Sequence, residues 1–364
     1  MRASLLSLAT AVTLAASCGD QAVPPLQSAE TCAGAWQPLS ARYFGDERGD
    51  FSFAPWAIAY ANGLIYYDTS TTAAEIVALP VAGGSPSPVV PFQLAVTGLW
   101  AEGDHLLFAN GSKFYSVPLT GGTPSLLFDA LGGQQIPDES LVQDVSPTHF
   151  YWNALDMSAD GQSGMSVWRA ARTGGNPVKL GFVPDNVVLP GVGGMALASD
   201  AVLFAGDLGF SAVVPFDGGA VRALAPGGDY YCGVDSSGAY WASVVGDPTE
   251  ERFTIVFSPA DGGARRTFWA YPPRHTLPFR IWQTGDGSWL VIALQRFSDG
   301  LTHTSFWELD AAGNARLLAC DPGGGNLSPY IDTRPAFTPE AAFFMASYVE
   351  ATGTLAWEIA RIAR

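Results

Sequence analysis

One short segment carries oxygen ligands at a spacing that could bind a cation. Asp156, Ser158 and Asp160 alternate with other residues, and Gly161 follows them. Calcium loops place oxygen ligands at positions one, three and five, with a glycine at the sharp turn that comes next. The closing bidentate acid is missing, because position twelve is Val167. The segment predicts a calcium site in the long loop between two strands. The alternative is a polar hairpin tip in which Asp-Gly forms the turn.

The other reactive side chains show no catalytic or metal-binding pattern. The chain has four histidines, His105, His149, His275 and His303. No two of them have the spacing of metal ligands, and no Gly-x-Ser-x-Gly elbow presents a nucleophile. Adjacent acids such as Asp138 and Glu139 would face opposite ways on a strand. We therefore expect no catalytic residues and no cofactor other than calcium.

The first seventeen residues are typical of an export signal. Met1 and Arg2 begin a short positive region, and residues 3–16 are small and mostly apolar. This run is too short to span a membrane but suits the apolar part of a signal peptide. It ends Leu-Ala-Ala-Ser-Cys18, which resembles the bacterial lipobox, although Ala15 stands where leucine is usual. We expect lipidation of Cys18. The alternative is secretory cleavage near Ala16, which leaves Cys18 as a thiol.

Lipidation predicts a place in the envelope of a Gram-negative bacterium. Several acyl chains on one cysteine anchor a protein stably, and Gly19 after Cys18 favours the outer over the inner membrane. Residues 18–35 have the composition of a tether, so the anchor is the expected membrane contact. Acidic residues outnumber basic ones 34 to 18, and the formal net charge is −16. This charge argues against nucleic acid as a partner.

Three further cysteines, Cys32, Cys232 and Cys320, allow at most one disulfide among themselves. An exported location permits such a bond. Their spacing does not select the pair.

A recurring turn is the strongest pattern in the chain. Each copy has an alternating apolar stretch, a Gly-Gly or Gly-Asn pair, and a second apolar stretch. The turns begin at Gly83, Gly121, Gly174, Gly218, Gly262 and Gly313. They lie about 46 residues apart on average, which is the length of a four-stranded propeller blade. Glycine and asparagine supply the positive φ angles that tight hairpin turns need.

Each repeat therefore predicts four antiparallel strands, a to d, and no long segment has helical periodicity with caps. The last repeat stops after residues 356–362, which match strand c. The stretch 36–44 resembles the strand that follows a Gly-Gly turn, so we expect it to complete the last blade and close the ring. The prediction is one all-β domain over residues 36–364, a propeller of seven four-stranded blades. Six blades is the alternative.

These turns resemble a known group of proteins. Val117-Pro-Leu-Thr-Gly-Gly-Thr-Pro124 follows the pattern Val-Pro-x-x-Gly-Gly-x-Pro of seven- and six-bladed propeller lipoproteins of GC-rich bacteria. Those proteins are loosely related to TolB-like propellers. The resemblance covers essentially residues 36–364 and implies a propeller with a lipid anchor. It implies no functional residues.

The end of the central channel is the expected ligand face, because strand a lines the channel and the d-to-a connections form one mouth. Polar and aromatic residues lie on or near these connections: Trp56, Tyr230, Arg280, Trp282, Tyr330 and Arg334. The arginines could hold an anion, and the aromatic rings could stack a sugar or pack a peptide. The alternative is that the rings fill the space between blades and the arginines pair with aspartates.

These features favour a non-catalytic binding or scaffold protein, a monomer, that recognises an envelope protein or a glycan. Two alternatives stay open. One is an enzyme acting on a sugar or lactone at the channel mouth, which needs convergent acids or a bound metal there. The other is a subunit of an outer-membrane assembly complex, which needs an interface above about 1,000 Å².

Overall fold

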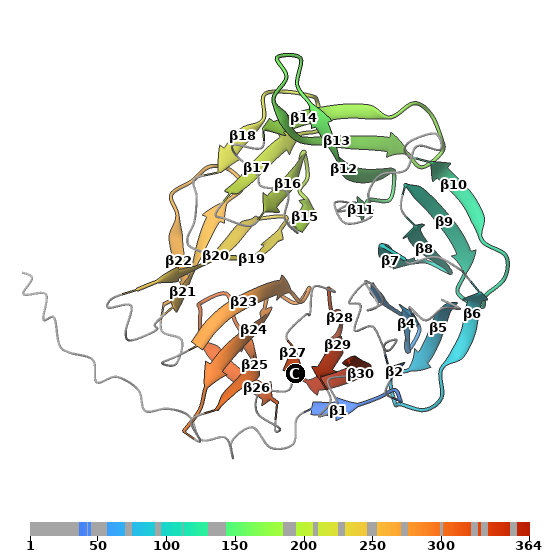
Figure 1. Cartoon of the computed structure of the whole chain (residues 1–364), viewed down its shortest axis with the longest axis vertical. Helices are drawn as coiled ribbons and strands as arrows, with labels where there is room; N and C mark the ends of the chain where they lie inside the picture. Colours follow the sequence, from blue (N-terminus) through green and yellow to red (C-terminus); the bar gives the residue numbers. More distant parts are fainter. Residues whose placement is uncertain are drawn as a thin grey trace, which may run out of the picture.

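The chain folds into seven antiparallel sheets arranged as a ring, the blades of a β-propeller (Figure 1). The computed structural model describes residues 36–41, 43–44, 57–69, 75–91, 96–110, 112–129, 143–184, 194–206, 210–224, 230–245, 253–270, 276–298, 301–321, 327–328, 334–349 and 355–364. The predicted all-β fold and the count of seven blades are confirmed. Within the described ranges, no helix is long and apolar enough to cross a membrane.

The first three blades are consecutive four-stranded meanders. Blade 1 contains β3 (Ile58–Ala61), β4 (Leu64–Asp68), β5 (Glu75–Pro80) and β6 (Ser87–Pro91). Blade 2 contains β7 (Gly98–Glu102), β8 (His105–Asn110), β9 (Lys113–Pro118) and β10 (Ser125–Asp129). Blade 3 contains β11 (Gln143–Val145), β12 (His149–Met157), β13 (Ser163–Ala171) and β14 (Val178–Pro184). The first strand of each is its strand a, nearest the centre of the ring (Figure 1).

Blades 4 to 6 repeat this arrangement. Blade 4 contains β15 (Gly194–Leu197), β16 (Ala201–Gly206), β17 (Phe210–Pro215) and β18 (Arg222–Leu224). Blade 5 contains β19 (Tyr230–Asp235), β20 (Gly238–Val244), β21 (Phe253–Pro259) and β22 (Arg266–Trp269). Blade 6 contains β23 (Thr276–Gln283), β24 (Trp289–Arg296), β25 (Thr302–Leu309) and β26 (Ala315–Cys320).

The repeated Gly turns join strands c and d, and their hydrogen bonds explain the motif. In blade 2 the Gly121 amide donates to the Pro118 carbonyl, 2.8 Å away, and Gly121 has a φ of 91°. A Cβ on Gly121 would lie 2.7 Å from the Val89 carbonyl oxygen of blade 1. The glycine thus serves the turn and also lets neighbouring blades approach closely.

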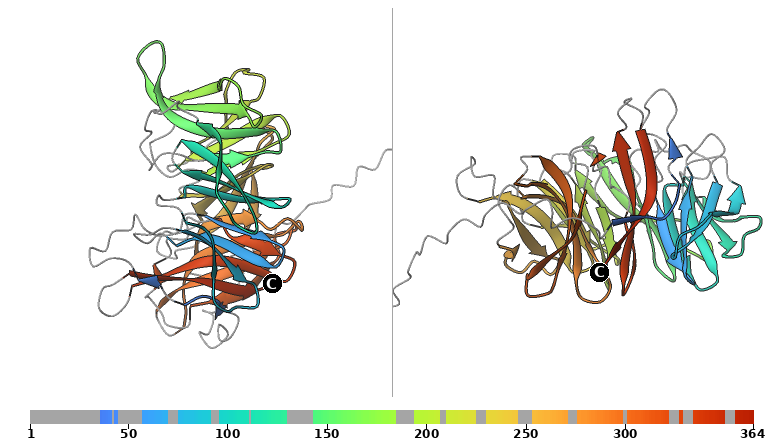
Figure 2. Two further views of the ribbon diagram at one scale, coloured as in Figure 1. Left: turned by 90° about the vertical axis from the view of Figure 1, so that its right-hand side faces the viewer. Right: turned by 90° about the horizontal axis from the view of Figure 1, so that it is seen from below.

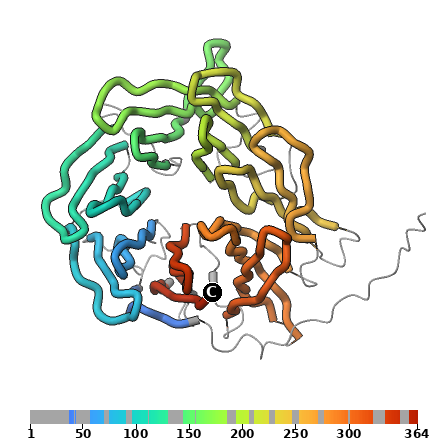
Figure 3. The backbone as a smooth tube through the Cα atoms, turned by 180° about the vertical axis from the view of Figure 1, so that it is seen from behind, coloured from blue at the N-terminus to red at the C-terminus, as the bar shows by residue number. Residues whose placement is uncertain are grey.

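Blade 7 is built from both ends of the chain. Its later strands are β27 (Leu327–Ser328), β28 (Ala336–Thr338), β29 (Ala341–Val349) and β30 (Leu355–Ala363). The outer edge of β30 pairs with β1 (Trp36–Pro38) and β2 (Tyr43–Phe44). Figure 3 shows β1 in blue beside this last blade in red. The prediction that the stretch 36–44 closes the ring is confirmed.

Side-chain contacts reinforce this closure. The Ile359 amide donates to Ser40 Oγ, 2.9 Å away, and the Leu39 amide donates to the Ile359 carbonyl. The Tyr43 ring stacks on Trp357 with centroids 4.2 Å apart, and its hydroxyl lies 3.0 Å from that of Tyr67 in blade 1. The N-terminal stretch therefore fastens blade 7 to blade 1.

Large side chains fill most junctions between blades, but the junction of blades 4 and 5 differs. Blades 5 and 6 meet around Trp269, Trp289 and Trp307. The inner part of the junction of blades 4 and 5 holds Tyr231 and Trp241. A second cluster at this junction has smaller side chains: Ala198, Ala201, Leu203, Val213, Leu224, Val234 and Ala260. These side chains fill less of the space between blades 4 and 5.

Replacing Tyr43 by alanine should destabilise the ring. The variant loses the Trp357 stack and the hydroxyl contact with Tyr67, and we expect a cost of about 2–3 kcal/mol. Thermal unfolding of the wild type and Tyr43→Ala measures it. The matched control is Tyr230→Ala, because this tyrosine is 52% exposed and lies in blade 5, away from the closure. Equal losses in the two variants would show that the N-terminal stretch does not hold the ring closed.

Candidate functional site

Arg280 and Tyr231 meet on the inner strands of adjacent blades. Arg280 lies on β23 and Tyr231 on β19, with the guanidinium carbon 6.0 Å from the ring centroid. The guanidinium also donates to the Phe279 carbonyl, 2.9 Å away. β23 spans Thr276–Gln283, so Arg280 lies within strand a of blade 6 and not in a connection between blades. An arginine over an aromatic ring holds a positive charge beside an apolar surface.

Asp144 and Arg334 form a second polar group. Asp144 lies on β11 and accepts a hydrogen bond from the Val145 amide at 2.8 Å. Burial raises the pKa of Asp144, whereas the Val145 amide, the charge of Arg334 and a hydrogen bond from Trp100 act to lower it. Arg334 itself is exposed. Trp100 was not among the expected site residues, because it belongs to a β7 segment that looks like an ordinary hairpin strand.

The remaining residues of the expected ligand face divide into three groups. Tyr230 is 52% exposed at the start of β19, with its ring 6.3 Å from that of Phe253. Trp282 is half-buried and packs into the core where blade 6 meets blade 7, as the packing alternative supposed. Trp56 and Tyr330 lie outside the described residues. The predicted ligand face therefore stays a prediction.

The calcium-like segment is part of a long hairpin rather than a wide loop. β12 runs through Met157, and Asp156 pairs with Gly164 across the hairpin. Figure 2 shows this hairpin in green, extending beyond the neighbouring blades. Its five-residue tip is a short polar hairpin turn, which is the arrangement that the alternative to a calcium loop describes.

The three expected calcium ligands have other partners. Asp156 accepts hydrogen bonds from Ser166 Oγ and from Lys179 Nζ at 2.7 Å, which lower its pKa to about 2. Ser158 donates to Asp160 instead of facing Asp156. Among the described residues, no group of three or more His, Cys, Asp or Glu side chains is placed to hold a metal. Calcium binding here stays a prediction, and it would require Asp156 to leave Lys179.

The described histidines have local partners. His105 lies 2.6 Å from Asp104, and His149 lies 2.8 Å from Thr148 Oγ1. Buried His303 contacts the Asp321 carbonyl at 2.6 Å and packs edge-on against Phe297. His275 lies outside the described residues. Each of these three histidines therefore has a hydrogen-bonding partner close by.

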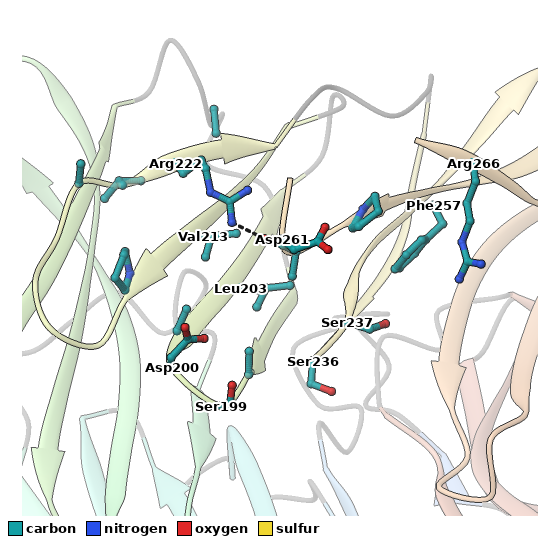
Figure 4. Close-up of a pocket in the computed structure, with 18 residues that line it drawn as sticks. Ser199, Asp200, Leu203, Val213, Arg222, Ser236, Ser237, Phe257, Asp261 and Arg266 are labelled. Atoms are coloured by element: carbon teal, nitrogen blue, oxygen red, sulfur yellow. Dashed lines mark hydrogen bonds between the residues drawn. The ribbon is translucent and has the colours of Figure 1, made fainter. Parts of the chain in front are cut away.

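The sequence did not predict a groove between blades 4 and 5. It has a volume of about 990 Å³. It lies on the face formed by the a–b turns, with Ser199, Asp200, Ser236 and Ser237, and by the neighbouring c–d turns (Figure 4). The buried side chains of Leu203, Val213 and Phe257 line it, and Arg222, Asp261 and Arg266 stand on its rim. It occupies the junction that small side chains fill incompletely.

The groove combines an apolar lining with exposed charges. Ligand sites in proteins typically pair a mostly apolar surface with a few placed polar groups, over volumes of about 300–1,000 Å³. The groove meets both conditions. It is therefore a candidate ligand site that can be described residue by residue.

Comparisons with known proteins show the fold and no family. No protein-family model and no curated protein matches the chain. A solved structure of YCF48 bound to D1 peptide matches with a TM-score of 0.50 and 9% identity, over 92% of this chain and 99% of that one. The acylaminoacyl peptidase of Pyrococcus horikoshii matches with a TM-score of 0.52 and 10% identity, over 82% of this chain. The match spans only 50% of that enzyme. BamB from Moraxella catarrhalis matches at a TM-score of 0.43 and 13% identity, over 84% of this chain and 85% of that one.

Asp144→Asn should stabilise the protein near neutral pH. Because folding raises this pKa, the folded protein holds the proton more tightly than the unfolded chain does. The carboxyl group therefore favours folding below its ordinary pKa, and this contribution is lost as pH rises to the raised value. Asparagine at this position removes the charge that burial disfavours. The thermal midpoint of Asp144→Asn should therefore exceed that of the wild type at pH 7 and equal it in acid.

The control for this comparison is Asp104→Asn. Its hydrogen bond and charge interaction with His105 lower the pKa of Asp104, so neutralising it should bring no gain. A midpoint at pH 7 that is unchanged or lower in Asp144→Asn would contradict the burial of this carboxylate.

Proposed function

We propose that this protein is a non-catalytic propeller that binds another protein of the bacterial envelope. The groove between blades 4 and 5 is the observation that carries the proposal. It lies on a ring closed by pairing of both chain ends, and its size suits the side chains of a peptide segment. YCF48, a structural neighbour, was solved with a peptide bound. A glycan is the alternative ligand.

Attachment through lipid on Cys18 is part of this proposal, and the cysteines offer a test of it. Cys320 is disulfide-bonded, and Cys232 is a free, buried thiol whose pKa burial raises to about 12. Only Cys18 and Cys32 remain as partners for Cys320 within the chain. A cysteine with an acylated thiol cannot form a disulfide. Lipidation at Cys18 therefore requires Cys32 to be that partner.

Peptide mapping of the native protein without reduction should find Cys32 linked to Cys320, an acylated Cys18 and an unmodified Cys232. The membrane fraction of Cys18→Ser provides the control, since loss of the anchor should release the protein. A Cys18–Cys320 disulfide would contradict lipidation and leave ordinary secretory cleavage as the account of the N-terminus.

A second candidate, an enzyme acting on a sugar or lactone at the channel mouth, is favoured by one observation. The raised pKa of Asp144 is a property of carboxyl groups that donate protons in catalysis. Turnover of a sugar lactone that Asp144→Asn abolishes would support it.

Crosslinking in the intact envelope tests the binding proposal. A carbodiimide joins carboxylates to a partner's amines, and Asp200, Asp217 and Asp261 are exposed on the face that carries the groove. We expect one or a few proteins to be joined to these residues. The control is Asp129, a half-buried acid at the far end of β10 in blade 2. No protein adduct, or adducts spread evenly over all four acids, would contradict the proposal.

A further inference from the structure

Two arginines stand on the rim of the groove, one from each blade. Arg222 begins β18 and lies opposite Val213, whereas Arg266 begins β22 and lies opposite Phe257. Arg222 donates to the Ala260 carbonyl across the junction. The Arg266 guanidinium lies over the Phe257 ring, 5.0 Å from its centroid. The groups that hold the two guanidinium groups in position, a backbone carbonyl and an aromatic ring, are therefore neutral.

Basic residues near the start of the outer strand in two other blades are placed differently. In blade 3, Lys179 forms an ion pair with Asp156 at 2.7 Å. In blade 6, Arg316 lies opposite Glu308 and forms an ion pair with it. Within the described part of the chain, neither Arg222 nor Arg266 forms an ion pair. The base thus has an acidic partner in two blades, on strand b in blade 3 and directly opposite on strand c in blade 6. Among the described residues, the arginines of blades 4 and 5 have neutral partners instead.

The acids of the groove limit what can bind near these arginines. Asp261 stands on the rim, where its Oδ1 accepts a hydrogen bond from the Gly263 amide at 2.8 Å. Asp200 lies on the a–b turn of blade 4, away from both guanidinium groups (Figure 4). An anion at the rim would thus meet two positive charges and one negative charge. Asp261 lies between the two arginines in the view of Figure 4, so its charge weakens the binding of an anion there.

We propose that this groove binds an acidic segment of a partner protein, with an apolar side chain on Leu203 and Val213 and two neighbouring carboxylates, one beside Arg222 and one beside Arg266. This inference rests on the proposed function and names the chemistry of its ligand. A chain with a formal net charge of −16 repels acidic segments over most of its surface. Two unpaired guanidinium groups beside an apolar floor therefore give such a segment one specific place to dock, since guanidinium matches carboxylate geometry.

The test uses two fluorescein-labelled peptides, Gly-Ser-Leu-Glu-Glu-Leu-Gly-Ser and its twin with glutamine for both glutamates. Fluorescence anisotropy measures their binding to the full chain. We expect the acidic peptide to bind about tenfold more tightly than its twin, and less tightly as salt is added, because these charges are exposed.

Variants that remove either the positive or the negative charges of the rim sharpen the test. Arg222→Gln with Arg266→Gln should weaken binding of the acidic peptide about tenfold. Asp261→Asn should strengthen it about threefold, since asparagine keeps the Oδ1 acceptor for Gly263 and removes the repelling charge. Arg316→Gln is the matched control, because Glu308 already occupies that guanidinium, and its affinity should equal that of the wild type.

The inference would be overturned if the two peptides bound with equal affinity or if neither bound. It would also be overturned if Arg316→Gln lost as much affinity for the acidic peptide as the double variant does. The same double variant in the envelope crosslinking experiment separates it from the proposed function. If the double variant and the wild type capture the same protein equally, the function stands and this docking site is wrong. If the wild type captures no protein, both fail.

Discussion

Pairing between the two ends of the chain is the constraint on which the rest of the structure depends. β30 is central in blade 7 only because β1 and β2 cover its outer edge. Arg364 fastens the same blade to blade 6. Its side chain, 3% exposed, lies 3.0 Å from Glu308 and 2.7 Å from Asp286, and it also donates to the Thr338 carbonyl. Closure gives every blade two neighbours and leaves no sheet edge open at the junction.

A closed ring of unequal junctions explains where a binding site can arise. Tryptophan-rich junctions such as that of blades 5 and 6 leave little space, whereas alanines in the junction of blades 4 and 5 leave a groove. Its lining comes from the central strands β16, β17 and β21, and its rim from tight turns and the outer strands β18 and β22. Ordered walls reduce the entropy lost when a partner docks.

The fold could be predicted from the sequence because its signals are local. The amide of the first glycine in each repeated turn donates to the carbonyl three residues before it, and the spacing of the turns gives the length of a blade. The groove could not be predicted, because it depends on side chains from two blades whose packing no single segment reveals. Trp282 shows the same limit: its side chain packs against the core between blades 6 and 7, a contact that its own segment does not reveal. Arg222 and Arg266 each follow the Gly turn of their repeat, but only the contrast with the Arg316–Glu308 pair gives these positions meaning.

Hydrogen exchange of two shortened chains tests the central claim, that the N-terminal stretch closes and holds the ring. One chain lacks residues 1–35 and keeps β1 and β2, and the other lacks residues 1–44 and has neither; both lack Cys18 and Cys32. We predict that amides of β29 and β30 stay protected in the first and exchange much faster in the second, while β20 and β21 change least. Equal protection of β30 in both chains would show that the ring is closed without the N-terminal stretch, and would contradict the account.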